Sequence, residues 1–203
     1  MQLSEWPSAI KRFIDIVISL TLLVATAPIV LIAIFAIAVT SKGPVFYLGK
    51  RYGARERQFT CFKLRTMHLN QGALLHEKGL NSLGANGRLL VFNDDPRIGR
   101  VGRFLRRFSI DEVPQLLNVL AGDMSLIGPR PLPPSMLEGF PEIRAMRSVV
   151  RPGISGLWQV RHRKKNASVL DMLEDDLEYI RTFSLSLDLK IAWATIPKII
   201  EPS

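Results

Sequence analysis

The stretch FIDIVISLTLLVATAPIVLIAIFAIAV, residues 13–39, decides how the rest of the chain must be arranged. No charged residue occurs from Ile16 to Val39. A helix over those residues would be about 36 Å long, enough for a hydrocarbon layer about 30 Å thick. The apolar run is longer than that of a secretory signal peptide, and no clear cleavage pattern accompanies it. The segment is therefore predicted to be embedded in a membrane.

Pro28 lies in the middle of this segment, where its missing N–H and its ring disfavour a straight helix. Positive charge flanks both ends of the segment, at Lys11, Arg12, Lys42, Lys50 and Arg51. A spanning helix usually carries its Lys/Arg excess on one side only. A re-entrant hairpin that bends at Pro28 and returns to the same face explains both observations. A spanning helix with a proline kink is the alternative, and the residues alone leave both open.

The overall charge narrows the possible partners. The 203 residues include 27 Lys and Arg against 18 Asp and Glu, which gives a net charge of +9 and indicates an anionic partner. That partner is nucleic acid, an anionic membrane face or a phosphorylated substrate. Cys61 is the only cysteine, so no internal disulfide or cysteine-based metal site is expected, and a reducing, cytosol-facing compartment fits.

The remaining chain predicts an α-rich α+β fold with short strands. Expected elements are two short strands within 43–67, a loop-rich connection over 68–95 and a helix over 97–108. A second helix is expected over 111–120, then turn and loop over 122–135, and loop followed by strand over 151–160. Ser168 is expected to cap a helix that runs to Phe183, and a last amphipathic stretch ends the chain.

The adjacent carboxylates Asp111 and Glu112 follow a cluster of arginines and have two interpretations. Ser109 and Glu112 have the spacing of a helix capping box, which would make the acids structural. Alternatively, an exposed carboxylate can attack phosphorus and form an acyl phosphate, while its neighbour helps to hold Mg²⁺. Nearby arginines would then keep the carboxylate ionised and orient phosphate oxygens.

The arginines themselves exceed what one diphosphate needs. Several of the five between Arg97 and Arg107 are expected to form a solvated face or to lie on anionic lipid. Arg130 is held between Pro129 and Pro131, an arrangement typical of a structural turn and equally suited to a phosphate clamp. The three histidines lack metal-binding spacing, and no Walker A, GxGxxG or CxxC pattern occurs.

At these motifs the sequence resembles the monotopic phosphoglycosyl transferases, also called bacterial sugar transferases. The resemblance covers nearly the whole chain. It is carried by KRFIDIVIS, by FKLRTM at 62–67, by DPRIGRVGRFLRRFSIDEVPQLLNVLAGDMSLIGPRP at 95–131, by PGISGLWQV at 152–160 and by SLSLDLKI at 184–191. The long central block is the most specific of these.

The resemblance implies a membrane enzyme that transfers a sugar-1-phosphate from a UDP-sugar to a polyprenol phosphate, with undecaprenyl phosphate the expected acceptor, and releases UMP. It implies a re-entrant helix–break–helix hairpin over 1–42 and a catalytic domain over 43–203. Amphipathic interfacial helices would surround the site. The enzyme would lie at the cytoplasmic face of the bacterial inner membrane, beside anionic lipid, and act in exopolysaccharide or other glycan assembly. A homo-oligomer is possible and no nucleic-acid partner is implied.

By the same resemblance, Asp111 is the nucleophile, Glu112 is its acidic partner, and the pair works with Mg²⁺. Basic residues near the substrate match Lys63, Arg106, Arg130 and Arg163. Two positions depart from the family pattern. The helix break, commonly Ser-Pro, is Ala27-Pro28 here, with Thr26 a substitute hydroxyl, and Arg161-His162 replaces the small residues expected before Arg163.

Two rival functions follow from the residues. A membrane-tethered basic protein would bind anionic lipid or nucleic acid, although few aromatic residues lie among the arginines for stacking on bases. A phosphohydrolase would pass the acyl phosphate to water instead of to a lipid.

Overall fold

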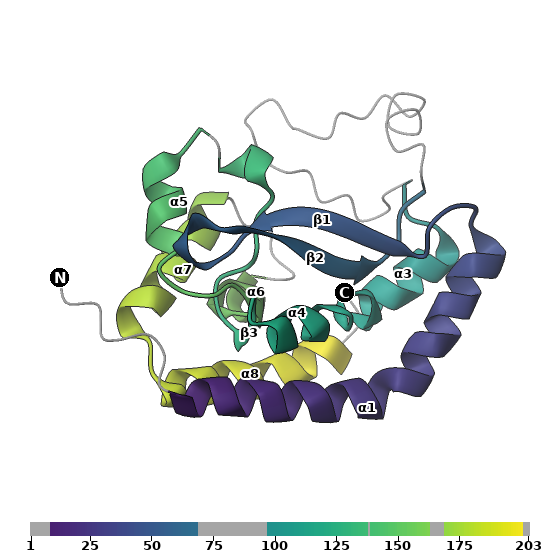
Figure 1. Ribbon diagram of the computed structural model, residues 1–203, viewed down its shortest axis with the longest axis horizontal. Coiled ribbons are helices and arrows are strands. Elements are labelled where there is room, and N and C mark those ends of the chain that lie inside the picture. Colours follow the sequence, from purple (N-terminus) through teal and green to yellow (C-terminus); the bar gives the residue numbers. More distant parts are fainter. Residues whose placement is uncertain (1–8, 69–96, 138, 163–168, 201–203) are drawn as a thin grey trace.

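The structure, a computed structural model, describes residues 9–68, 97–137, 139–162 and 169–200 (Figure 1). Its helices are α1 (Ala9–Thr40), α3 (Arg100–Arg107), α4 (Gln115–Ala121), α5 (Pro141–Arg147), α6 (Leu157–His162), α7 (Val169–Thr182) and α8 (Leu185–Ile200). Its strands are β1 (Phe46–Tyr52), β2 (Gln58–Leu64), β3 (Ser125–Ile127) and β4 (Gly153–Ser155). Short 3₁₀ turns are η1 (Ala54–Glu56), η2 (Ile110–Glu112) and η3 (Pro134–Met136). The fold is thus α-rich α+β, as predicted.

Helix α1 is the long apolar element that the sequence predicts, and it is long and apolar enough to cross a membrane. It remains helical through Ala27 and Pro28, so the expected break is absent from the secondary structure. Figure 1 instead shows α1 running beside α8 and then turning toward the strands, which a proline inside a helix explains. The Thr26 hydroxyl donates to the carbonyl of Leu22 at 2.6 Å, whereas Pro28 frees the carbonyl of Val24. Thr26 therefore does not bond the carbonyl that Pro28 frees, which is the role expected of a serine before the proline.

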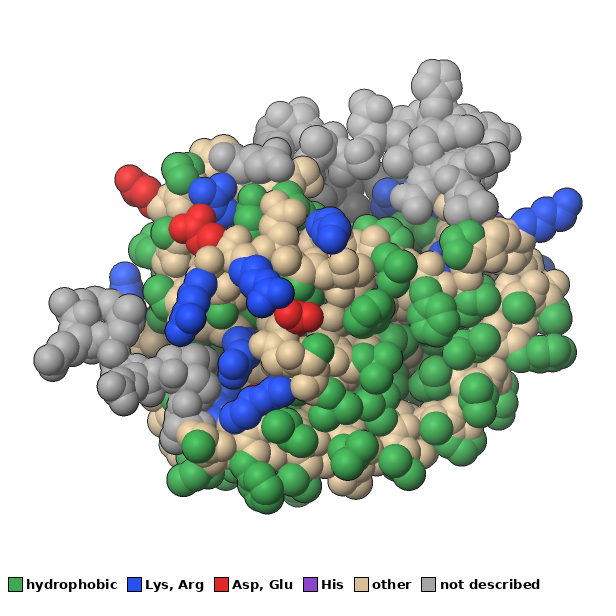
Figure 2. All heavy atoms as spheres, in the orientation of Figure 1, with side chains coloured by type: hydrophobic (Ala, Val, Ile, Leu, Met, Phe, Trp, Pro, Cys, Tyr) green, Lys and Arg blue, Asp and Glu red, His purple; other side chains and the backbone are tan. Residues whose placement is uncertain are grey.

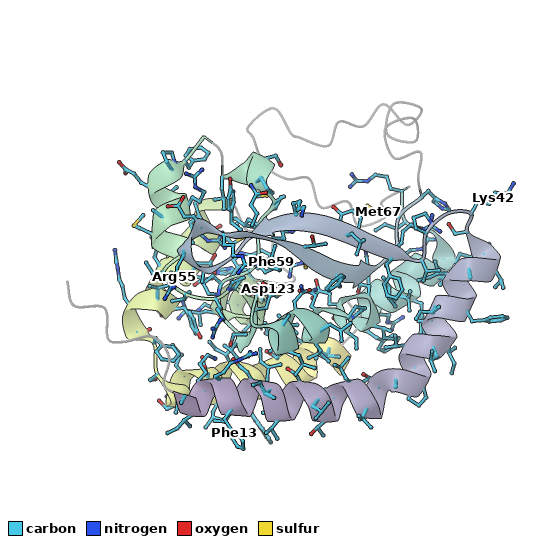
Figure 3. The ribbon with its side chains drawn as sticks, in the orientation of Figure 1. Phe13, Lys42, Arg55, Phe59, Met67 and Asp123 are labelled. Atoms are coloured by element: carbon cyan, nitrogen blue, oxygen red, sulfur yellow. The ribbon has the colours of Figure 1, made fainter. Side chains whose placement is uncertain are left out.

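Most apolar side chains of α1 are exposed, which separates it from the core helix of a soluble protein. Leu20, Val24, Leu31, Ile32 and Phe35 all have more than half of their surface accessible. In Figure 2 hydrophobic side chains cover the edge of the molecule that α1 forms, and Phe13 points away from the body in Figure 3. An apolar face of this extent is a membrane contact.

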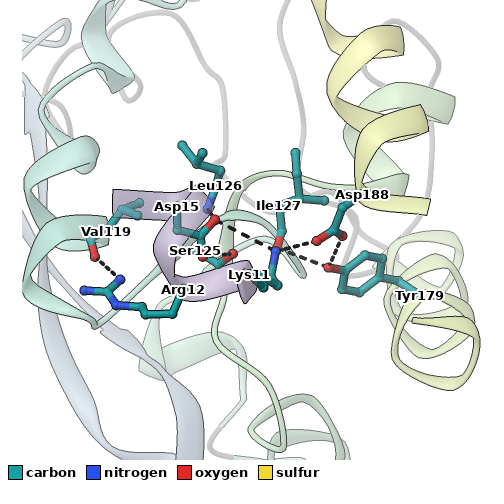
Figure 4. A network of polar contacts seen from close by, with 9 residues as sticks. All are labelled: Lys11, Arg12, Asp15, Val119, Ser125, Leu126, Ile127, Tyr179 and Asp188. Carbon is teal, nitrogen blue, oxygen red and sulfur yellow. Dashed lines mark hydrogen bonds and ion pairs between the residues drawn. The ribbon is translucent and has the colours of Figure 1, made fainter. Parts of the chain in front are cut away.

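The N-terminal half of α1 is attached to the domain by buried polar contacts (Figure 4). Lys11 forms an ion pair with Asp188 of α8, and Asp15 accepts hydrogen bonds from the hydroxyl of Ser125 at 2.8 Å and the amide of Leu126 at 3.2 Å. We call Lys11, Asp15, Ser125, Tyr179 and Asp188 the anchoring cluster. Its members link the membrane helix to β3, α7 and α8.

The C-terminal half of α1 is attached differently, by apolar packing. Ala33 and Ile37 are buried against Leu64 of β2 and Leu105 of α3. Close approach also occurs between α3 and the segment after β2, because a Cβ added to Gly102 would lie 2.1 Å from the carbonyl oxygen of Thr66. Gly102 is therefore required by the packing of α3 against this segment.

Two small sheets complete the core. Strands β1 and β2 pair antiparallel from Phe46↔Leu64 to Tyr52↔Gln58, which confirms the two strands predicted within 43–67. Strands β3 and β4 pair in parallel. The loop prediction for 122–135 was wrong at β3, since three residues are too few to show alternation.

Two other predictions, one of a strand and one of a helix, need adjustment. The strand predicted at the end of 151–160 is helix α6, because the extended residues that pair with β3 come earlier, in β4. The helix predicted over 111–120 is divided into η2 and α4, with the left-handed Gly122 ending α4 as expected. The predicted connection over 68–95, apart from His68, and Ser168 lie outside the described residues.

Candidate active site

The turn that carries Asp111 and Glu112 is set by Ser109, whose backbone is left-handed with φ 56°. Left-handed backbone is uncommon outside glycine and marks positions held by surrounding structure. Ser109 makes no side-chain capping bond, and the carboxylate of Glu112 is engaged elsewhere. The capping box is therefore not formed, and the two acids are displayed by a short 3₁₀ turn instead.

Glu112 is enclosed by two of the predicted basic residues. Its Oε1 accepts hydrogen bonds from Lys63 Nζ at 2.6 Å and from Arg130 at 3.1 Å. Burial alone would raise the pKa of Glu112, but Arg130 and Lys63 outweigh it and hold that pKa well below the usual range. Glu112 is therefore a permanent anion that brings β2, η2 and the loop after β3 together.

Asp111 has the opposite environment. It is 8% exposed, yet its side chain makes no hydrogen bond or ion pair with any residue that the structure describes. Burial and the neighbouring Glu112 raise its pKa to about 6, and together they outweigh Lys63, Arg106 and Arg130. Arg106 and Arg130 do lower the pKa of Asp111, as expected, but burial and Glu112 outweigh them, so the net shift is upward.

Arg106 and Arg163 were the other two predicted substrate contacts. Arg106 Nε donates to Thr66 Oγ1 at 2.8 Å, and the side chain lines the same groove as the acidic pair. Arg163 lies outside the described residues. Five of the six predicted site residues thus line one groove: Lys63, Arg106, Asp111, Glu112 and Arg130.

Arg147 and Asp176 hold the backbone of Arg130 and were not identified from the sequence. The guanidinium of Arg147 donates to both the carbonyl oxygen of Arg130 and the carboxylate of Asp176, each at 2.6 Å. Arg147 and Asp176 are both buried. This pair fixes the backbone that presents Arg130 to Glu112. The signal for this pair in the sequence is Asp176 itself, a charged residue on an otherwise buried face of α7.

A groove of about 1430 Å³ connects the acidic pair with the membrane helix. Its polar end holds Lys63, Arg106, Asp111, Glu112 and Arg130. Its apolar part is lined by residues from α1, β1, α3 and α8, including Leu22, Ile29, Phe46, Leu48, Phe104 and Ile199. The groove can therefore hold a molecule with a charged head and an apolar tail.

The acidic pair is also suited to Mg²⁺. No group of three or more His, Cys, Asp or Glu side chains converges within the described parts of the chain. Mg²⁺ at phosphate sites commonly takes one or two carboxylates and completes its shell with substrate oxygens and water. Asp111 and Glu112 are two hard-oxygen ligands at the mouth of a groove lined by cations, so the residues present fit this ion.

Comparison with known proteins agrees with these features. The family model "Bacterial sugar transferase" matches residues 6–202. An undecaprenyl-phosphate glucose phosphotransferase of Komagataeibacter xylinus is 38% identical over 98% of this chain and 37% of its own length. A UDP-glucose:undecaprenyl-phosphate glucose-1-phosphate transferase of Caulobacter vibrioides is 39% identical over 94% of this chain and 69% of its own length.

A third relative is closer to this chain in length. The exopolysaccharide production protein ExoY of Sinorhizobium fredii is 35% identical over 93% of this chain and 84% of its own. The chain thus spans about a third of the first relative and most of the other two. Since the family model covers nearly all of the sequence, the chain belongs to the bacterial sugar transferase family.

Proposed function

We propose that this protein transfers a sugar-1-phosphate from a UDP-sugar to undecaprenyl phosphate or a similar polyprenol phosphate, as the first membrane step of exopolysaccharide or related glycan synthesis. The observation that carries the proposal is the carboxylate of Asp111, which has no partner among the described residues and lies with Lys63, Arg106 and Arg130 in the lining of a groove that extends to α1. The names of the relatives supply the substrates.

The reaction has two steps on one phosphorus atom. In the first, a carboxylate oxygen of Asp111 attacks the sugar-bearing phosphorus of the UDP-sugar, the bond to the bridging oxygen breaks, and UMP leaves with that oxygen. In the second, a phosphate oxygen of the polyprenol phosphate attacks the same phosphorus and the bond to Asp111 breaks. The product is a polyprenyl diphosphate sugar, and Asp111 is restored as a carboxylate.

The basic side chains and Mg²⁺ have different roles in this transfer reaction. Arg130 and Lys63 neutralise Glu112 in the resting site and lie close enough to the groove to contact the incoming diphosphate. Arg106 lies in the same lining and provides a further guanidinium for phosphate oxygens. Mg²⁺, which Asp111 and Glu112 would hold, supplies neutralisation of the diphosphate charge when bound.

The membrane arrangement belongs to the same proposal. We infer that α1 enters from the cytoplasmic face of the bacterial inner membrane, turns near Pro28 and returns, so that residues 1–42 form the membrane part and residues 43–203 the catalytic part. Basic residues flank both ends of α1, as a same-side arrangement requires. The lipid acceptor then reaches the groove from the bilayer while the soluble donor arrives from the cytosol.

The function is tested by measuring UMP release by the full chain in detergent with UDP-glucose and Mg²⁺, with and without undecaprenyl phosphate. We expect sustained UMP release only when the lipid phosphate is present. Equal release without the lipid would identify a phosphohydrolase. Salt-sensitive binding of anionic lipid without any UMP would identify a basic binding protein.

The topology is tested separately by cysteine labelling in intact cells. Single cysteines placed before residue 10 and after residue 42 should be labelled from the same face of the membrane. Cys61 is buried and gives little background. Labelling from opposite faces would replace the hairpin by a spanning helix.

A further inference from the structure

A second, smaller cavity of about 380 Å³ lies apart from the groove and shares none of its lining residues. Its wall is built by η1 with the strand residues around it, by the end of α4 and by the segment before β4. Arg55, Arg57 and Arg151 line it, and we call these three residues with the cavity the arginine pocket. Figure 3 shows Arg55, Phe59 and Asp123 near one another at this place.

The positive charge of the arginine pocket is poorly compensated. Within the described residues, the side chains of Arg55, Arg57 and Arg151 make no hydrogen bond or ion pair, and Asp123 is the single acidic lining residue. Burial, and after it the nearby guanidiniums of Arg12 and Arg55, lower the pKa of Arg151. Arg151 is half-buried whereas Arg55 and Arg57 are exposed, and like charges brought together at the rim of a cavity favour the binding of an anion.

Backbone strain at the same place is an independent observation. Arg55 and Glu56 are both left-handed, each with φ 56°, although neither is glycine. The Arg55 amide donates to the carbonyl of Ser148 at 2.6 Å, and Glu56 pairs with Arg144 at 2.6 Å, so tertiary contacts hold this turn. Two consecutive left-handed residues, the first of which places an arginine in the wall of a cavity, are the kind of backbone strain that is found at ligand clamps.

The pocket also lies beside the membrane helix. Arg12 of α1 donates to the carbonyl oxygens of Val119 and Leu120 at the end of α4, and its guanidinium comes within 3.7 Å of a Cβ placed on Gly122, which lines the pocket. The next residue, Phe13, is exposed and apolar. A phosphate at the membrane surface is therefore within reach of this site.

We propose that the arginine pocket binds a phosphate group, carried by an anionic phospholipid or present as a free phosphate. Guanidinium groups recognise phosphate oxygens through paired N–H donors, and here two arginines from the turn after β1 and one from the segment before β4 line the same cavity. The site is distinct from the catalytic groove, and the proposal stands whether or not the transferase reaction is correct.

The test compares binding by the full chain and its variants, with two probes. One probe is inorganic phosphate, titrated calorimetrically into the detergent-solubilised protein. The other is nanodiscs of phosphatidylcholine with or without phosphatidylglycerol. We expect Arg55→Ala to weaken binding about tenfold or more, as the loss of a charge-assisted contact does. Arg181→Ala removes the same charge from an exposed site on α7 and should change binding less than twofold.

Two further variants sharpen the result. Arg55→Lys keeps the charge but loses the planar fork, and should retain only part of the binding. Asp123→Asn removes the one acidic group and should strengthen binding. A response of both probes to Arg55→Ala identifies a general phosphate site, and a response of the nanodiscs alone identifies a lipid headgroup site. Equal losses for Arg55→Ala and Arg181→Ala, or no binding of either probe by the natural chain, would overturn the proposal.

Discussion

The anchoring cluster and the catalytic groove both bury charged groups and join segments far apart in sequence, but they differ in how completely those charges are paired. In the anchoring cluster, Asp188 accepts from Lys11 and from the hydroxyl of Tyr179, and Asp15 accepts from Ser125 and Leu126. In the groove, Glu112 is paired with Lys63 and Arg130, whereas Asp111 is left without a partner among the described residues.

This difference separates structural charges from reactive ones. A buried carboxylate without hydrogen bonds lowers the stability of the folded state, so its retention needs another reason. The groove beside Asp111 provides that reason, because a substrate phosphorus placed there would meet a poorly solvated nucleophile. The paired carboxylates of the anchoring cluster line neither the groove nor the arginine pocket, and they serve attachment of α1.

Asp111→Asn should give the largest effect. Loss of the nucleophile should reduce UMP release by about 1000-fold or more, as removal of a covalent catalyst does. Stability should change in the other direction, because the raised pKa of Asp111 reports an unfavourable carboxylate. We expect a gain of about 1 to 3 kcal/mol in the free energy of unfolding at pH 7, measured by chemical denaturation in detergent. A large loss of stability would make Asp111 structural.

Asp188→Ala should lower the stability of the folded protein, whereas Asp111→Asn should raise it. It removes the closer of the two carboxylates that pair with the buried Lys11 and leaves only Asp15, at 3.9 Å, which should lower the free energy of unfolding by about 3 kcal/mol. Glu174→Ala, at an exposed position of α7, should change that free energy by less than about 0.5 kcal/mol. Similar unfolding curves for the two variants would show that the anchoring cluster does not hold α1.

Arg147→Lys tests the link between a paired charge and the groove. Lysine keeps the charge beside Asp176 but lacks the fork that also reaches the carbonyl of Arg130, so Arg130 should be positioned less well. We expect kcat/KM for the UDP-sugar to fall about tenfold, with most of the loss in KM. Arg144→Lys on the same helix is the control, since Arg144 pairs with Glu56 away from the groove. A fall in stability with unchanged KM would limit Arg147 to a structural role.

The pH dependence of the rate of the first step should be the smallest of these effects. Because the pKa of Asp111 is raised to about 6, it is protonated below that pH and cannot attack phosphorus. The rate of the first step should therefore fall about tenfold for each pH unit below 6. Glu112→Gln removes the neighbouring negative charge and frees Lys63 and Arg130 for Asp111, so the acid limb should move to lower pH. A limb that stays in place would mean that Glu112 does not control Asp111.

Much of this arrangement was predictable from local patterns. The run of uncharged residues around Pro28 predicted α1, and β-branched and aromatic residues broken by glycines predicted β1 and β2. Asp111, Glu112 and Arg130 were singled out from the local pattern of charges and prolines, whereas Lys63 was identified only through the resemblance to a known family.

The features that could not be predicted from the sequence depend on contacts between segments far apart in the chain. The Arg147–Asp176 pair joins positions 29 residues apart, and no periodicity connects them. The raised pKa of Asp111 depends on its burial and on the neighbouring Glu112, and the burial is produced by segments far apart in the sequence. The arginine pocket likewise exists only because η1, α4 and the segment before β4 meet in space.

Intact-mass measurement of the protein mixed with a UDP-sugar and Mg²⁺, without lipid acceptor, tests the central claim most directly. The account predicts a mass increase equal to one phosphosugar, located on Asp111 by fragmentation, absent from Asp111→Asn and discharged when polyprenol phosphate is added. UMP formation with no mass increase at any time, or an adduct on another residue, would contradict it.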